Sequence, residues 1–132
     1  MKHPTKKRAK TRAWDLCSQW VRLKEADEDG YVKCYTCDTV KYWKGDGMQA
    51  GHVIQGRGNS ILFETDGIRP QCYGCNVRQR GRLDIMVPKI IDEIGRERYD
   101  ELLSLKGKEL KRSVSDYLAL EIQYKAKINE LS

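Results

Sequence analysis

Four cysteines stand in two pairs, with two residues between the partners of each pair: Cys34 with Cys37, and Cys72 with Cys75. This spacing is typical of structural zinc, because one tight turn brings two thiolates to about 3.7 Å, the edge of a tetrahedron around Zn²⁺. Two disulfides are the alternative, which the lack of an apolar secretion signal disfavours. We therefore expect the four cysteines to hold zinc. A site of three cysteines and His52 is the competing arrangement.

The interval between the two pairs is long. Thirty-four residues separate Cys37 from Cys72, compared with roughly 15–20 in a compact two-knuckle site. A folded unit must fit there, and it contains His52, one of two histidines. Asn76 follows the last cysteine directly. A neutral imidazole can deprotonate water near pH 7, and an amide oxygen can bind a hard divalent cation. These residues are consistent with phosphodiester hydrolysis; a structural histidine and a helix-capping asparagine are the alternatives.

Positive charge is concentrated in two places. The formal net charge is +6, and six of the 25 basic side chains lie in residues 1–12, which hold no acid. The other 19 match the 19 acidic side chains, but several arginines gather between residues 51 and 82. This distribution favours a polyanionic partner, most simply DNA, over charges that only aid solubility. The candidate DNA contacts are Lys6, Lys7, Arg8, Arg57, Arg69, Arg78, Arg80 and Arg82.

The chain of 132 residues supports one domain with extensions at both ends. Residues 1–11 are charged and contain a proline, which predicts a flexible basic arm. Residues 12–105 form the expected zinc-containing domain, and residues 106–132 a helical extension. No run of about 18 apolar residues is present, so we expect no membrane span.

Short elements must position the cysteines and the histidine. Apolar residues at helical spacing predict a helix over 12–26, in which Cys17 is a buried small hydrophobe. A short helix is expected over 76–83. The expected strands are 31–33, 39–43, 48–54 (which carries His52) and 61–63, the last as the returning strand of the hairpin.

The C-terminal third reads as helical. Pro88 is suited to the first turn of one helix. A second helix is expected over 96–105, and a last helix is expected to be capped by Ser115. An apolar stripe runs along this last helix and consists of Tyr117, Leu120, Tyr124, Ile128 and Leu131. We expect it to pack on the body of the protein, with a homodimer through this C-terminal helix as the alternative.

The order of these motifs resembles the ββα-metal nucleases, also called His-Me finger or HNH nucleases, and more closely the phage NinG/Rap recombination nucleases. The matching stretches are 12–14, 18–23, 32–37, 49–52 (Gln-Ala-Gly-His), 57–60, 63 and 70–76 (Pro-Gln-Cys-Tyr-Gly-Cys-Asn). The resemblance implies an α+β fold, with a zinc-stapled ββα-metal core, an N-terminal helix and C-terminal helices. It also implies an endonuclease for branched or single-strand-containing DNA, such as D-loops and Holliday junctions, acting in phage recombination or repair in the host cytoplasm.

The same resemblance implies roles for single residues. His52 would be the general base, and Asn76 a ligand of a catalytic Mg²⁺ or Mn²⁺, while the zinc would take no part in the chemistry. Many relatives carry an acidic ligand directly before the histidine, where this chain has Gly51. A second oxygen must come from elsewhere, and the candidates are Glu64, Asp66 and Gln79, with Glu64 preferred because it follows the expected returning strand. A non-catalytic, zinc-stabilised DNA-binding protein on a degenerate HNH fold is the alternative.

Overall fold

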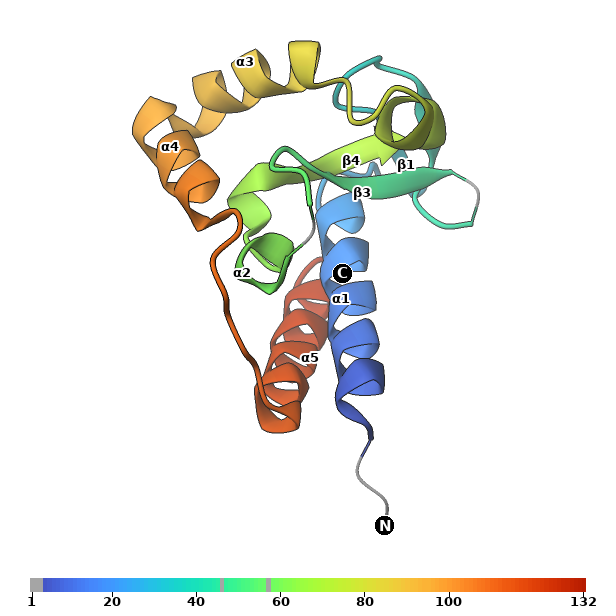
Figure 1. The fold of residues 1–132 in the computed structure, drawn as a ribbon. Helices are drawn as coiled ribbons and strands as arrows, with labels where there is room; N and C mark the ends of the chain where they lie inside the picture. The colour runs from blue at the N-terminus through green and yellow to red at the C-terminus, as the bar shows by residue number, and fades with distance from the viewer. Residues whose placement is uncertain (1–3, 46, 57) are drawn as a thin grey trace.

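The computed structural model describes residues 4–45, 47–56 and 58–132 (Figure 1). Its elements in chain order are α1 (Lys6–Leu23), β1 (Tyr31–Lys33), β2 (Val40–Tyr42), β3 (Met48–His52), α2 (Asn59–Leu62), η1 (Thr65–Gly67), β4 (Ile68–Cys72), η2 (Gly74–Arg78), α3 (Leu83–Ile94), α4 (Arg96–Leu105) and α5 (Val114–Asn129). The strands form two antiparallel pairs, β1 with β2 and β3 with β4. The expected α+β class is confirmed.

Helix α1 begins earlier than the sequence indicated. The Thr5 hydroxyl accepts a hydrogen bond from the backbone N–H of Arg8 at 3.2 Å and caps the helix. Residues 6–11, which we expected in a flexible arm, are therefore its first turns. Its buried face repeats every four residues and consists of Ala9, Ala13, Cys17 and Val21. Burial raises the pKa of the Cys17 thiol to about 11, which agrees with its expected role as a small buried hydrophobe.

Helix α5 packs along α1 as expected, and the two helices lie side by side in Figure 1. Tyr117 and Tyr124 of α5 share one core cluster with the small residues of α1. The cap is Ser113 rather than Ser115: its hydroxyl accepts from the N–H of Asp116, whose carboxylate accepts from the N–H of Ser113. This reciprocal capping box fixes the start of the helix two residues before the expected position.

Strand β3 ends at His52 and pairs with β4, so that Met48 lies opposite Cys72 and His52 opposite Ile68. The returning strand expected at 61–63 is wrong, because those residues lie in α2 and directly after it. Their apolar side chains enter the core from a short helical turn. A run of three apolar residues has no period that separates a helical turn from a strand.

The segment after the second cysteine pair also differs from expectation. The helix expected over 76–83 is a single π-helical turn, η2, and α3 begins at Leu83. Pro88 therefore lies inside α3 and not in its first turn. Met86 and Ile90, on the buried face of α3, join a second core cluster with Leu102 of α4. Burial of this face stabilises the helix although the proline removes one backbone hydrogen bond.

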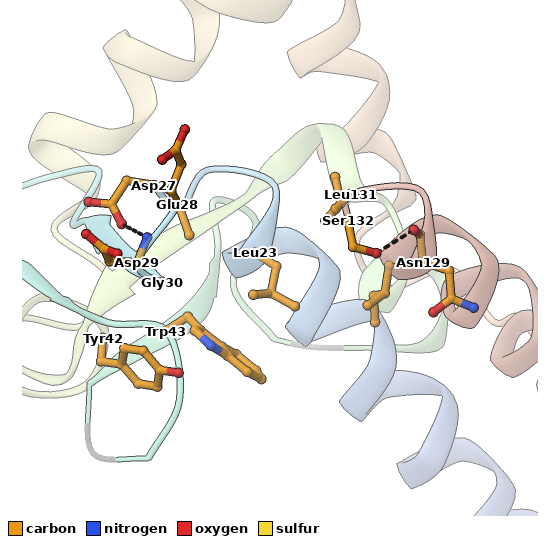
Figure 2. Close-up of a pocket in the computed structure, with 12 residues that line it drawn as sticks. Leu23, Asp27, Glu28, Asp29, Gly30, Tyr42, Trp43, Asn129, Leu131 and Ser132 are labelled. Carbon is orange, nitrogen blue, oxygen red and sulfur yellow. Dashed lines mark hydrogen bonds between the residues drawn. The ribbon is translucent and has the colours of Figure 1, made fainter.

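A hollow of about 590 Å³ lies where the end of α1, the turn at 27–30 and the end of α5 meet (Figure 2). Its rim carries Asp27, Glu28 and Asp29. The Asp27 carboxylate accepts hydrogen bonds from the N–H groups of Asp29 and Tyr31 at 3.0 and 2.9 Å, which fixes the turn. The acidic rim repels phosphate, so this hollow is not a candidate DNA contact. No helix in the described parts of the chain has the length and apolar character needed to cross a bilayer.

Candidate metal centre and histidine site

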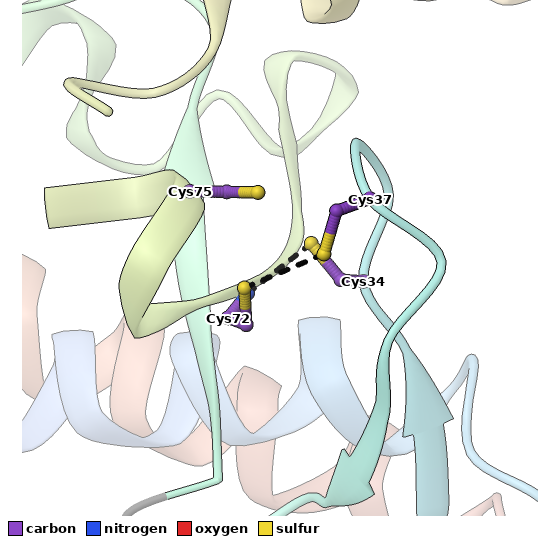
Figure 3. Close-up of side chains that lie close together, drawn as sticks. All are labelled: Cys34, Cys37, Cys72 and Cys75. Carbon is purple, nitrogen blue, oxygen red and sulfur yellow. Dashed lines mark hydrogen bonds between the residues drawn. The ribbon is translucent and has the colours of Figure 1, made fainter. Parts of the chain in front are cut away.

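The four paired cysteines converge on one point (Figure 3). Their sulfur atoms all lie within 4.8 Å of one another, and Sγ of Cys37 lies 3.6 Å from Sγ of Cys72. That distance is close to the edge of a zinc–thiolate tetrahedron and far longer than a disulfide bond. The backbone N–H of Cys72 points at Sγ of Cys34 at 3.3 Å. The cluster can hold a metal ion such as zinc, and among the described residues His52 is not part of it.

The four thiols differ in acidity. Burial acts to raise the pKa of Cys34, but hydrogen bonds from the backbone N–H of Cys72 and from Thr36 outweigh it and lower that pKa. Burial dominates at Cys75 and raises its pKa well above the ordinary value. One thiol thus ionises readily and another resists ionisation. A bound divalent cation is what would stabilise all four as thiolates together.

His52 is held from two sides at the end of β3. Its side chain is 7 % exposed, and its ring stacks on Trp14 of α1 with 5.1 Å between ring centres. Its Nε2 lies 3.1 Å from the carbonyl oxygen of Leu62. A carbonyl only accepts, so a neutral ring carries its proton on Nε2 and its lone pair on Nδ1. The helical turn α2, missed from the sequence, thus selects the tautomer of His52.

Asn76 lies on η2, directly after the last cysteine. Its Nδ2 donates to Oε1 of Gln49 on β3 at 2.7 Å. Its Oδ1 faces Gly51, where an added β-carbon would lie 3.0 Å from that oxygen. The β3–β4 pair and the turn that follows it therefore bring Asn76 beside the Gly51–His52 step. Asn76 is thus close to Gly51, the neighbour of His52 in the chain, and the roles expected for His52 and Asn76 stay predictions.

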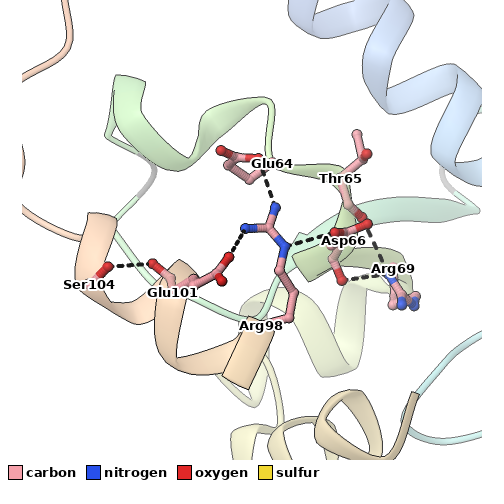
Figure 4. Close-up of polar contacts among 7 residues, drawn as sticks. All are labelled: Glu64, Thr65, Asp66, Arg69, Arg98, Glu101 and Ser104. Atoms are coloured by element: carbon pink, nitrogen blue, oxygen red, sulfur yellow. Dashed lines mark hydrogen bonds and ion pairs between the residues drawn. The ribbon is translucent and has the colours of Figure 1, made fainter. Parts of the chain in front are cut away.

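The acidic candidates for a cation ligand are engaged elsewhere. The carboxylates of Glu64 and Asp66 accept from the guanidinium of Arg98 at 3.3 and 2.9 Å (Figure 4). Glu64 follows α2 rather than a returning strand, so the reason for preferring it as the second cation ligand no longer holds. Glu64 does line a small cavity together with His52. Gln79 is exposed at the end of η2.

The family model described as "Bacteriophage Lambda NinG protein" matches residues 2–132. The chain belongs to the NinG family. It is similar to two curated proteins, each named "Protein ninG", from Escherichia phage 933W and Enterobacteria phage VT2-Sa. Each is 27 % identical over 110 residues, which is 83 % of this chain and 52 % of the relative. The chain thus spans about half the length of these relatives. No solved structure matches it.

The arginines expected to contact DNA in this NinG-family chain fall into two groups. Arg69 is half-buried: its guanidinium donates to the carbonyls of Thr65, Asp66 and Ile68 and lies 3.7 Å from the carboxylate of Glu93. These contacts give Arg69 a structural role, so its expected role as a DNA contact is not supported. Arg57 lies outside the described residues.

The other basic candidates remain accessible. Lys6, Lys7 and Arg8 are exposed on the first turn of α1, and Arg78 and Arg80 are exposed after the cysteines. Arg80, Gly81 and Arg82 have φ values of 52°, 92° and 48°, so three consecutive residues adopt the left-handed conformation. The left-handed conformation costs free energy at both arginines, which follow Asn76 closely in the sequence.

Removal of the Arg98 side chain should have a measurable effect on stability. Arg98→Ala should lower the free energy of unfolding by about 1–2 kcal/mol, because it removes three ion pairs from a side chain that is only partly exposed. Arg96→Ala is the matched control: within the described ranges Arg96 pairs only with Asp100, on the surface of α4, and its loss should cost less than about 0.5 kcal/mol. Urea unfolding compares the two, and equal effects would contradict a special role for Arg98.

Proposed function

We propose that this NinG-family chain is a divalent-metal-dependent DNA endonuclease of the HNH superfamily, and that it cuts branched or single-strand-containing DNA. The observation that supports this most directly is the placement of His52. Its ring is oriented by the Leu62 carbonyl and by Trp14, and Gly51, the residue before it in the chain, faces the amide oxygen of Asn76. An imidazole with a fixed tautomer and an amide oxygen at the neighbouring position suit hydrolysis of a phosphodiester.

In the proposed reaction, Nδ1 of His52 accepts a proton from a water molecule, whose oxygen attacks the phosphorus. The bond between the phosphorus and the leaving sugar oxygen breaks at the same time, and that oxygen takes a proton from solvent. The carbonyl of Leu62 stabilises the resulting imidazolium through the Nε2 proton. Asn76 would hold a Mg²⁺ or Mn²⁺ ion, which neutralises charge on the phosphate and the leaving oxygen when bound. A structural zinc held by Cys34, Cys37, Cys72 and Cys75 would join the turn between β1 and β2 to the end of β4.

The test is cleavage of defined DNA structures by the purified chain. Linear duplex, single strand, D-loop and four-way junction are each incubated with Mg²⁺, Mn²⁺ or EDTA. We expect cutting that requires the divalent ion and favours a branched substrate. Cutting that persists in EDTA, or equal cutting of linear duplex, would contradict the proposed mechanism or the proposed substrate.

A second candidate is a non-catalytic DNA-binding protein that keeps the same fold. Two observations favour it: Gly51 supplies no ligand beside His52, and the carboxylate of Glu64 is paired with Arg98. This candidate predicts binding of branched DNA without cutting under any of the ion conditions above.

Arg78, Arg80 and Arg82 lie within seven residues of Asn76 and are proposed to contact phosphates. Their joint replacement by glutamine should weaken DNA binding and reduce the slope of log K against log salt concentration by about 3, because each phosphate contact contributes roughly 0.9. Replacing the exposed Lys108, Lys111 and Lys125 with glutamine removes the same charge elsewhere and should change the slope little. Equal changes in both triple variants would indicate a general charge effect instead.

A further inference from the structure

Gln71 places a buried amide between Thr36 of the first cysteine turn and Gly51, the residue before the histidine. It lies on β4 next to Cys72 and is 0 % exposed. Its Nε2 donates to the hydroxyl of Thr36 at 3.1 Å and to the carbonyl of Gly81 at 2.8 Å. Since a carbonyl only accepts, the contact with Gly81 fixes which end of the amide carries the hydrogens.

The opposite end of this amide is unsatisfied. Oε1 of Gln71 is buried and accepts no hydrogen bond in the described structure. Buried polar atoms without a partner are rare in folded proteins, and each indicates strain, a functional role or an ion or water that completes it. The two hydrogen bonds of Nε2 prevent the side chain from turning this oxygen elsewhere.

Gly51 shows where the unsatisfied oxygen is directed. A β-carbon added at Gly51 would lie 1.9 Å from Oε1 of Gln71 and 3.0 Å from Oδ1 of Asn76. Both amide oxygens therefore face the place where a side chain at position 51 would begin. A residue other than glycine would displace the Gln71 oxygen, so the two positions depend on each other.

We propose that Oε1 of Gln71 is the second oxygen ligand of the divalent cation, beside Oδ1 of Asn76. This inference rests on the proposed nuclease function and replaces Glu64 as the expected ligand. Gln71 takes the part of an acidic side chain before the histidine, because it reaches from β4 into the space that Gly51 leaves. Amide oxygens are suitable ligands for Mg²⁺ and Mn²⁺.

The proposed ligands carry no charge, which sets the strength of binding. A divalent cation binds more weakly in an oxygen-ligand site when fewer of the ligands are negatively charged, so we expect dissociation constants on the order of millimolar without DNA. A substrate phosphate would add the missing negative charge. The alternative is purely structural: Oε1 packs against the Gly51 α-carbon in a weak C–H···O contact and binds no ion.

The experiment is a Mn²⁺ titration of the zinc-loaded, ¹⁵N-labelled full chain, followed by paramagnetic line broadening. Broadening should centre on the backbone amides of residues 51, 52, 71 and 76. Gln71→Ala should raise the half-saturating Mn²⁺ concentration about tenfold or more, in line with the effect of disturbing a metal site. Gln123→Ala removes an exposed glutamine on α5 and should leave the concentration unchanged.

Two further variants keep the test decisive if Gln71→Ala loses zinc. Gly51→Ala retains the glutamine but pushes its oxygen aside, and should also weaken Mn²⁺ binding about tenfold. The double variant Gly51→Asp with Gln71→Ala supplies a carboxylate in the freed space and should restore binding. Zinc content and thermal unfolding are measured for each variant to separate ligand loss from misfolding.

The outcomes separate this proposal from the proposed function. Mn²⁺ binding that Asn76→Ala weakens, while Gln71→Ala and Gly51→Ala do not, would overturn the role of Gln71 and leave the nuclease in place. No broadening near Gly51 and no cutting of any DNA would overturn both. Weakening by Gln71→Ala and by Gly51→Ala, with rescue by the double variant, would support the proposed ligand.

Discussion

Replacement of His52 by glutamine should reduce metal-dependent cutting of branched DNA by about 10²- to 10⁴-fold or more, while DNA affinity and metal content stay near those of the wild type. A glutamine side chain can still donate to the Leu62 carbonyl, but it cannot accept a proton from water near neutral pH. His52→Ala should lose the same activity and in addition some stability, because it also removes the stacking on Trp14.

Single-turnover cleavage of a four-way junction measures this effect, with DNA binding measured by titration in Ca²⁺ or EDTA. His3→Ala serves as the histidine control and should cut like the wild type. Residual cutting by His52→Gln within a fewfold of the wild-type rate would mean that another group activates the water, and the role assigned to His52 would be wrong.

Loss of the cysteine cluster should have the largest effect on structure. Cys72→Ser, or chelation of the proposed zinc, should unfold the region that contains the two cysteine pairs. Apparent binding free energies of structural zinc are about 10–16 kcal/mol, which is comparable to the whole stability of a small domain. Three of the five buried residues in this core cluster are cysteines, with Val32 and Met48, so little apolar packing remains without the metal.

Zinc content and circular dichroism measure the effect, and Cys17→Ala is the matched control because Cys17 lies in a different core cluster and should leave the zinc bound. Zinc affinity should also fall as the pH falls, since protons compete for the thiolates. A zinc-free Cys72→Ser protein with wild-type spectra and stability would contradict a structural role for the metal.

The sequence predicted those parts of the molecule that depend on local chemistry. The cysteine spacing predicted the cluster, and the short segments expected as strands at 31–33, 39–43 and 48–54 match β1, β2 and β3 to within a residue or two. The returning strand failed because the apolar run at 61–63 is too short to show a period. The position of α2, which carries these residues, depends on contact with α4, and no local sequence pattern indicates that contact. The Ser60 hydroxyl of α2 donates a hydrogen bond to the Leu105 carbonyl of α4 at 2.7 Å.

Some residues of the candidate site could likewise be predicted from the sequence, and others could not. His52 and Asn76 carry residue types with recognisable chemistry, so both could be named in advance as candidates. The Leu62 carbonyl is a backbone group, and every residue offers one, so no sequence signal marks it. Gln71 gave no signal because a glutamine in a strand is ordinary. Only the fold shows that its amide is buried between Gly81 and Gly51.

The pairing of α1 with α5 has a consequence for how the protein folds during synthesis. About ninety residues of chain separate the end of α1 from the start of α5. Contacts between such distant segments form slowly, because a long loop must close before any packing energy is gained. The cysteine pairs are much closer in sequence and can assemble first. On the ribosome, the part of the buried face of α1 that packs on α5 stays exposed until α5 has been synthesised, and a chaperone has that interval in which to bind it.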